Sequence, residues 1–214
     1  MLSITLQPNI DSHILFVGGG AVAERRIGLC IHEACCIVIS PVVTDQIRRW
    51  SEMGLITWHK SIFKDVHIEI LKSSRLVFIC TNHTAINDEL ESLARRYKVL
   101  LNRSDNPLAC DFTVPSTLNI GDVHISIGAN NGGPRVNRLI RQDMTKRYSE
   151  LKIVMPRLKI IREEVKLLIP RVDERQQFWR THLDEIAFQA ILDGDWPLIE
   201  EKLHHAISGI RPKS

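Results

Sequence analysis

Three small residues near the N-terminus have the spacing of a phosphate-binding loop. Gly18, Gly20 and Ala23 form the pattern G-x-G-x-x-A directly after the apolar run HILFV and at the start of a helical pattern. In such a loop the first glycine permits a tight turn, the second lets the backbone approach a pyrophosphate, and the small third residue lets helix pack on strand. Free N–H groups of the first helical turn suit phosphate oxygens. The pattern predicts a dinucleotide site, and its alternative is a glycine turn of purely structural use.

The predicted cofactor site draws on residues after three strands. Dinucleotide sites often carry Asp or Glu at the end of the second strand; Ser40 stands there instead. Because no Arg or Lys lies between Ile37 and Gln46 to meet a 2′-phosphate, we expect NAD rather than NADP. The full expected set is Gly18, Gly19, Gly20, Ala21, Val22 and Ala23, then Ser40, Pro41, Val42 and Val43, and finally Thr81.

Strands that alternate with helices must position this loop. Helical patterns of 10–15 residues between apolar runs indicate βαβ units and a parallel sheet. The runs lie at 13–17, 35–40, 55–60, 75–81 and 99–102, with helical patterns at 21–33, 45–53 and 85–97. In the first of these helical patterns Val22, Ile27, Cys30 and Ile31 are the expected inward positions.

The pattern changes after Pro107. Residues 112–115 and 123–128 predict two short strands joined by a turn at 119–122, and Pro134 suits the first position of a helix. Further helices are expected over 135–168, 174–193 and 197–207, with an apolar stripe of Leu158, Ile161, Val165 and Leu168 on one face of the first. The fold class is therefore α/β, with a Rossmann-type parallel sheet at the N-terminus, then a small β segment and a helical C-terminal part.

Composition and charge are those of an ordinary soluble protein. The 214 residues are 44% hydrophobic and 25% charged, and the net charge of +3 is too weak to indicate nucleic acid. No stretch approaches the ~18 apolar residues of a membrane helix, and no secretory signal is visible. We therefore expect a cytoplasmic protein without a nucleic-acid or membrane partner.

Cysteine and histidine give no metal signature. The five cysteines, with Cys35 and Cys80 expected inside buried strands or at their edges, show neither CxxC nor zinc spacing, and free thiols fit a reducing cytoplasm. The nine histidines form no HxxxH or HExxH, and only His124 is expected near the proposed site. No resident metal is predicted.

Four segments together resemble one family, the precorrin-2 dehydrogenases of sirohaem biosynthesis. This family includes stand-alone enzymes, bifunctional dehydrogenase–ferrochelatases and the N-terminal half of sirohaem synthases. The segments fall in the family's order over nearly the whole chain: FVGGGAVAERR (16–26), NRSDNPLACDFTVPS (102–116), GDVHISIGANNGGPRVNRLIR (121–141) and ERQQFWRTHL (174–183).

The resemblance implies three domains and one reaction. Residues 1–110 would bind NAD, 111–148 would form a dimerisation and substrate segment, and 149–214 a helical domain, in a homodimer that the apolar stripe also favours. The reaction would be the NAD-dependent oxidation of precorrin-2, a tetrapyrrole, to sirohydrochlorin. Some members also insert ferrous iron, so iron or cobalt would enter only as a substrate.

Asp105 is the candidate catalytic residue. It follows a strand at the carboxyl end of the sheet and matches the family's aspartate implicated in dehydrogenation and chelation. Hydride removal from a tetrapyrrole must be accompanied by loss of a proton. A carboxylate could accept it if burial raised its pKa from ~3.9 toward neutrality. The alternative is that Asp105 only caps the turn before Pro107.

A tetrapyrrole with acetate and propionate groups is acidic, and guanidinium groups bind carboxylates well. Arg135, Arg138 and Arg141 share one face of the predicted helix, although an ordinary solvated face is an equal alternative. The expected substrate-binding residues are Asn102, Asn130, Asn131, Gly132, Gly133, Arg135 and Arg138.

Two family serines are absent in the third segment. Ala129 and Gly133 stand in their places, which leaves metal insertion open. A non-catalytic regulatory paralogue that binds NAD or a tetrapyrrole is therefore kept as an alternative. A nucleotide-sensing module that gates a transporter is disfavoured, because such modules depend on the acidic residue missing after the second strand.

Overall fold

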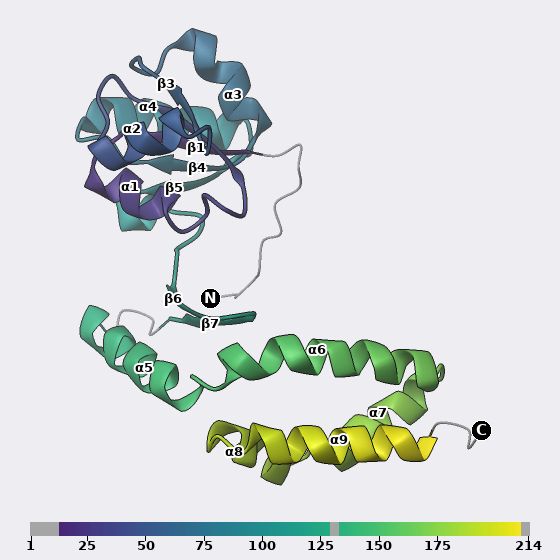
Figure 1. The fold of residues 1–214 in the computed structure, drawn as a ribbon. Coiled ribbons are helices and arrows are strands. Elements are labelled where there is room, and N and C mark those ends of the chain that lie inside the picture. Colours follow the sequence, from purple (N-terminus) through teal and green to yellow (C-terminus); the bar gives the residue numbers. More distant parts are fainter. Residues whose placement is uncertain (1–12, 129–132, 211–214) are drawn as a thin grey trace. The chain divides into compact units, whose positions relative to one another are not determined.

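A computed structural model describes residues 13–128 and 133–210, and they divide into two compact units, Met1–Thr113 and Val114–Ser214 (Figure 1). No helix among the described residues is long and apolar enough to cross a membrane.

The first unit is built on a sheet of five parallel strands in the order β3-β2-β1-β4-β5. This is the Rossmann order, in which the chain changes direction between β1 and β4 and leaves a crevice at the carboxyl ends of those strands. The predicted Rossmann-type parallel sheet is confirmed. The strands are β1 (His13–Val17), β2 (Cys35–Ile39), β3 (Thr57–His59), β4 (Ser74–Ile79) and β5 (Leu100–Arg103).

Helices bury the sheet on both faces. Leu15 and Phe16 are successive residues on opposite faces of β1, and both are fully buried. On one face Leu15, Val77 and Ile79 pack with Leu90 in a shared core. The helices of this unit are α1 (Ala21–Ile27), α2 (Asp45–Glu52), α3 (Ile68–Ser73) and α4 (Thr84–Arg96), with short 3-10 turns η1 (Asp65–His67) and η2 (Pro107–Ala109).

Some expected inward positions in this unit are exposed. Ile27 and Ile31 are buried, but Val22 is 39% exposed because it lies in the first turn of α1, beside the glycine loop. Cys35, the first residue of β2, is exposed, and its neighbour Cys36 is buried instead. Cys80 is only partly buried, since it follows the last residue of β4.

The second unit begins with a hairpin of β6 (Ser116–Ile120) and β7 (Val123–Ile127). The prediction of a strand over 112–115 was wrong, because Pro115 has no N–H to donate to a sheet. The strand is instead STLNI, in which the side chains of Leu118 and Ile120 point inward. The hairpin turn consists of Gly121 and Asp122 and is shorter than the expected 119–122. Gly121 adopts φ +57, which suits a two-residue hairpin turn.

Over residues 133–210 this unit continues with the helices α5 (Pro134–Arg147), α6 (Leu151–Leu168), α7 (Val172–His182), α8 (Glu185–Leu192) and α9 (Trp196–Ile210). Pro134 starts α5 as predicted. The helix expected over 135–168 breaks at 148–150, where no proline or glycine marks the end. The helix expected over 174–193 also breaks, because Asp184 caps α8 by accepting a hydrogen bond from the Ala187 N–H at 2.8 Å.

The predicted apolar stripe of α6 lies in the core of its own unit. Ile161 and Val165 are buried there with Leu203 of α9, and Leu158 and Leu168 pack against them. The stripe therefore packs within one chain and gives no support to a dimer contact. A different apolar row of α6 remains exposed at Ile153 (61%), Ile160 (71%) and Leu167 (82%).

Candidate active site

In the glycine loop after β1, the backbone at Gly18 and Gly19 lies close to neighbouring segments, whereas Gly20 faces open space. Gly18 has φ +109, and a Cβ there would lie 2.6 Å from the Cys80 carbonyl oxygen after β4. A Cβ on Gly19 would lie 2.5 Å from the Val42 carbonyl oxygen. A Cβ on Gly20 would meet nothing within 4 Å, so the third glycine faces open space where a phosphate can reach the backbone.

Hydrogen bonds fix this loop to its neighbours. The Gly18 N–H donates to the Ile39 carbonyl at 3.0 Å, and the Thr44 N–H donates to the Gly19 carbonyl at 3.0 Å. Ala23 is fully buried and lets α1 lie close to the sheet. Because α1 has only seven residues, we attribute the anion-binding character of the loop to its open backbone rather than to a helix dipole.

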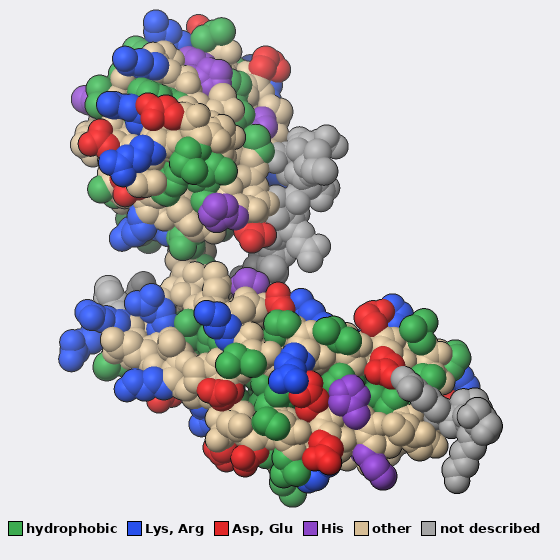
Figure 2. Space-filling model, in the orientation of Figure 1, with side chains coloured by type: hydrophobic (Ala, Val, Ile, Leu, Met, Phe, Trp, Pro, Cys, Tyr) green, Lys and Arg blue, Asp and Glu red, His purple; other side chains and the backbone are tan. Residues whose placement is uncertain are grey.

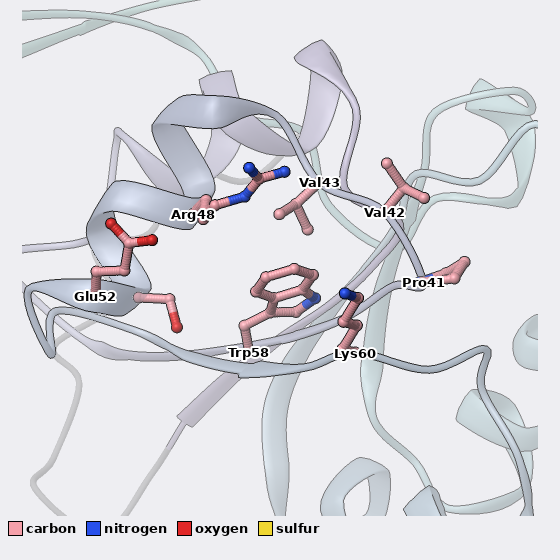
Figure 3. Close-up of a pocket in the computed structure, with 8 residues that line it drawn as sticks. Pro41, Val42, Val43, Arg48, Glu52, Trp58 and Lys60 are labelled. Atoms are coloured by element: carbon pink, nitrogen blue, oxygen red, sulfur yellow. The ribbon is translucent and has the colours of Figure 1, made fainter.

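A pocket of about 420 Å³ opens beside the end of β2 (Figure 3). Ser40 is 6% exposed; its hydroxyl donates to the Val42 carbonyl at 2.7 Å and its own carbonyl accepts from Trp58 Nε1 at 2.9 Å. Ser40 thus shapes the loop from within. The pocket is lined by the predicted Pro41, Val42 and Val43 and by the unpredicted Arg48, Trp58 and Lys60, among others. The sequence prediction missed the last three because α2 and β3 bring them to the end of β2 from farther along the chain.

Asp105 is held by a buried arginine at the end of β5. Arg103 is 4% exposed, and its Nε and Nη2 donate to Oδ1 and Oδ2 of Asp105 at 3.1 and 2.8 Å. Its Nη1 also contacts two carboxylates of α4, Asp88 Oδ1 at 2.7 Å and Glu91 Oε2 at 2.8 Å. This two-pronged contact fixes both the position and the plane of the Asp105 carboxylate.

Asn87 also holds Asp105 in place and connects it to Thr81, which lies after β4. Asn87 of α4 is 1% exposed and donates from Nδ2 to Asp105 Oδ2 at 3.0 Å and to the Thr81 carbonyl at 3.1 Å. Thr81 Oγ1 donates in turn to Asn87 Oδ1 at 2.5 Å. The Cys80 carbonyl packs closely against Gly18, and the next residue, Thr81, is hydrogen-bonded to Asn87. These contacts connect the glycine loop to Asp105 along the carboxyl edge of the sheet.

This network lowers the pKa of the Asp105 carboxyl. Hydrogen bonds from Arg103, with a smaller contribution from Asn87, outweigh desolvation and lower the pKa of Asp105 from 3.8 to about 2. Asp105 correspondingly raises the pKa of Arg103. The condition named for proton uptake, a pKa of Asp105 raised toward neutrality, is therefore not met, since the arginine two residues earlier favours the ionised carboxylate.

The predicted substrate residues are scattered over both units. Asn102 is 6% exposed and its Nδ2 donates to the Phe112 carbonyl at 2.9 Å, which favours a structural role. Gly133 precedes α5 with φ +93, whereas Asn130, Asn131 and Gly132, like Ala129, lie outside the described residues.

The remaining predicted contacts belong to the second unit. Arg135 and Arg138 are exposed on α5, over which Lys and Arg side chains gather in Figure 2. His124 of β7 is exposed and contacts Asn119 Oδ1 through Nδ1 at 2.9 Å. Over 13–128 and 133–210, no group of three or more His, Cys, Asp or Glu side chains is arranged to hold a metal ion.

Comparison with known families separates the two halves of the chain. Residues 7–116 match the family model described as "Putative NAD(P)-binding", and residues 157–207 match that of the sirohaem synthase dimerisation region. The first match covers the glycine loop, the β2 pocket and Asp105.

Curated relatives extend the similarity over most of the chain. A protein of Nitrosococcus oceani named "Siroheme synthase" is 29% identical over 91% of this chain and 42% of its own length. A protein of the same name from Xylella fastidiosa is 28% identical over 81% of this chain and 36% of its own length. The chain therefore spans about two fifths of these relatives.

One solved structure has the same fold. It is named "SirC, precorrin-2 dehydrogenase" and superposes with a TM-score of 0.79 over 98% of this chain and all of that one, at 18% identity. Because the first match covers more than half of the chain, the chain belongs to the family described as putative NAD(P)-binding, and the sirohaem synthase dimerisation region follows that domain.

Proposed function

We propose that this protein oxidises precorrin-2 to sirohydrochlorin with NAD as hydride acceptor. The observation that carries the proposal is the fixed Asp105 carboxylate, held by Arg103 and Asn87 at the same sheet edge as the glycine loop. The name of the similar solved structure, precorrin-2 dehydrogenase, supports the choice of substrate.

The chain's residues fit a dinucleotide. Gly18 and Gly19 keep the backbone close to β4 and to the Val42 loop, and open space at Gly20 leaves room for the pyrophosphate. We assign the cofactor contacts to Gly18–Ala23, Pro41–Val43 and Thr81, with Ser40 as the shaping residue of the second stretch. A bound nicotinamide supplies the hydride acceptor at this edge.

Asp105 acts on the tetrapyrrole by its charge. As a hydride leaves, positive charge develops over the conjugated macrocycle, and a carboxylate fixed beforehand stabilises that charge without reorganising. The macrocycle becomes strongly acidic as it gains positive charge, so a proton can leave it to a carboxylate of low basicity and then to water. Arg103 and Asn87 set the position of this carboxylate.

Two further parts of the proposal concern the second unit. We assign Arg135 and Arg138 to the acetate and propionate groups of the substrate, because guanidinium groups bind carboxylates in a forked geometry. We also propose a homodimer in which a second copy covers the exposed row Ile153, Ile160 and Leu167 of α6. Two of these residues fall within the match to the dimerisation region.

An anaerobic assay on enzymatically generated precorrin-2 tests the reaction. The absorbance spectrum is followed with wild-type protein and with Asp105→Asn, and NAD binding is titrated separately for both. We expect sirohydrochlorin from wild type only, with equal NAD affinity for the two proteins. Absence of product from a wild-type protein that binds NAD would instead support the non-catalytic paralogue.

A further inference from the structure

The pocket beside β2 has an apolar floor and a cationic rim. Val43 and Trp58 supply the floor, and the Trp58 ring is held in place by the hydrogen bond from Nε1 to the Ser40 carbonyl at 2.9 Å. Figure 3 shows Arg48 and Lys60 extending from α2 and from the end of β3 toward this floor.

Both cations are available to an anion. Arg48 Nη1 lies 3.8 Å from Asp45 Oδ1, and the two side chains are 52% and 83% exposed. An ion pair this exposed holds Arg48 only weakly. Lys60 lies 6.0 Å from the Trp58 ring centroid and, within the described part of the chain, has no carboxylate within 4.0 Å. Glu52 also lines the pocket, but Figure 3 shows it at the opposite end of the Trp58 ring from Lys60.

The position of these charges suits one part of a dinucleotide. At the end of the second strand an acidic residue selects the free ribose hydroxyls of NAD, and a nearby arginine accommodates the 2′-phosphate of NADP. Here the acidic residue is replaced by Ser40, whose hydroxyl donates within its own loop, and two cations face the same pocket.

On the basis of the cofactor site proposed above, we infer that Arg48 and Lys60 form a subsite for an adenosine 2′-phosphate. The chain then binds NADP as well as NAD, with little discrimination between them. The sequence expectation of NAD alone considered only residues 37–46, and α2 and β3 bring both cations from outside that window.

Binding of two fragments that cannot be reduced or oxidised tests this subsite apart from catalysis. Calorimetric titration of the full chain compares 2′,5′-ADP with 5′-ADP for wild type, Arg48→Gln and Lys60→Gln. Arg49→Gln is the matched control, since it removes the same charge from the same helix without lining the pocket. Thermal unfolding verifies that each variant is folded.

We expect wild type to bind 2′,5′-ADP at least as tightly as 5′-ADP. Each pocket variant should lose about tenfold affinity for 2′,5′-ADP only, an effect expected of a charged contact to phosphate, and Arg49→Gln should change neither. Wild type that prefers 5′-ADP tenfold, or variants that weaken both fragments equally, would overturn the subsite while leaving the cofactor site in place. Failure of both fragments to bind would overturn the cofactor site as well.

Discussion

Replacing Arg103 by lysine should separate the charge of this residue from its forked geometry. Arg103 makes four contacts of 2.7–3.1 Å to three carboxylates, of which two bind Asp105 from different nitrogens. A lysine ammonium preserves the charge but cannot contact both Asp105 oxygens and the α4 carboxylates together. Asp105 should therefore remain ionised and lose its fixed orientation.

The expected loss of stability in Arg103→Lys follows from the pKa and the exposure of Asp105. Lowering its pKa from 3.8 to about 2 corresponds to at most about 2.5 kcal/mol of interaction with the charged form. Because 32% of its side chain is exposed, screening by solvent reduces this to about 1 kcal/mol. We expect Arg103→Lys to lower the free energy of unfolding by about 1–2 kcal/mol, including the lost contacts to α4.

Steady-state kinetics and urea unfolding measure the two effects separately. If Arg103 positions Asp105, kcat should fall about 10- to 100-fold, because a misplaced group near the reacting atoms loses its orientation. KM for precorrin-2 and NAD affinity should change less than threefold. A variant that loses stability but retains wild-type kcat would refute the positioning role and leave Arg103 as a structural residue only.

Further predictions concern the loop, the carboxyl, the helical core and the dimer. In calorimetry, Gly20→Ala should weaken NAD binding at least tenfold and leave the stability of the fold unchanged, since its Cβ enters open space. Gly19→Ala should in addition destabilise the fold, because its Cβ would collide with the Val42 carbonyl oxygen. Asp105 contributes stability above pH ~3.8 that is lost as pH falls toward about 2, so acid unfolding of Asp105→Asn should show a smaller change across that window. Leu203→Ala should cost about 2–5 kcal/mol in urea unfolding, because Leu203 is fully buried in the helical core. Ile160→Lys should dissociate the dimer in sedimentation velocity, whereas Val66→Lys, at an equally exposed position of the first unit, should not.

Local patterns predicted the parts of the fold that depend on neighbouring residues. The glycine loop and the strands around it follow from short-range rules, so the parallel Rossmann sheet could be predicted. Pro134 marked the start of α5 for the same reason. The break at 148–150 has no proline or glycine to announce it and could be found only from packing.

The site required contacts that the chain makes over a distance. Asn87 reaches Asp105 from α4, and Arg48 and Lys60 reach the end of β2 from different elements. One signal was available locally, because Arg103 stands two residues before Asp105 at the end of an expected strand, where alternate residues point to the same side. That spacing predicts an ion pair and therefore a lowered, not a raised, pKa for the carboxyl.

The stoichiometry of a single anaerobic turnover tests whether this protein couples oxidation of precorrin-2 to reduction of NAD. Wild-type protein in excess over precorrin-2 is mixed with NAD, and reduced cofactor and sirohydrochlorin are followed together by their absorbance. We predict that both form in equal amounts at the same rate, and that Asp105→Asn binds NAD yet forms neither. Formation of sirohydrochlorin at the same rate without reduced cofactor, or with Asp105→Asn, would contradict it.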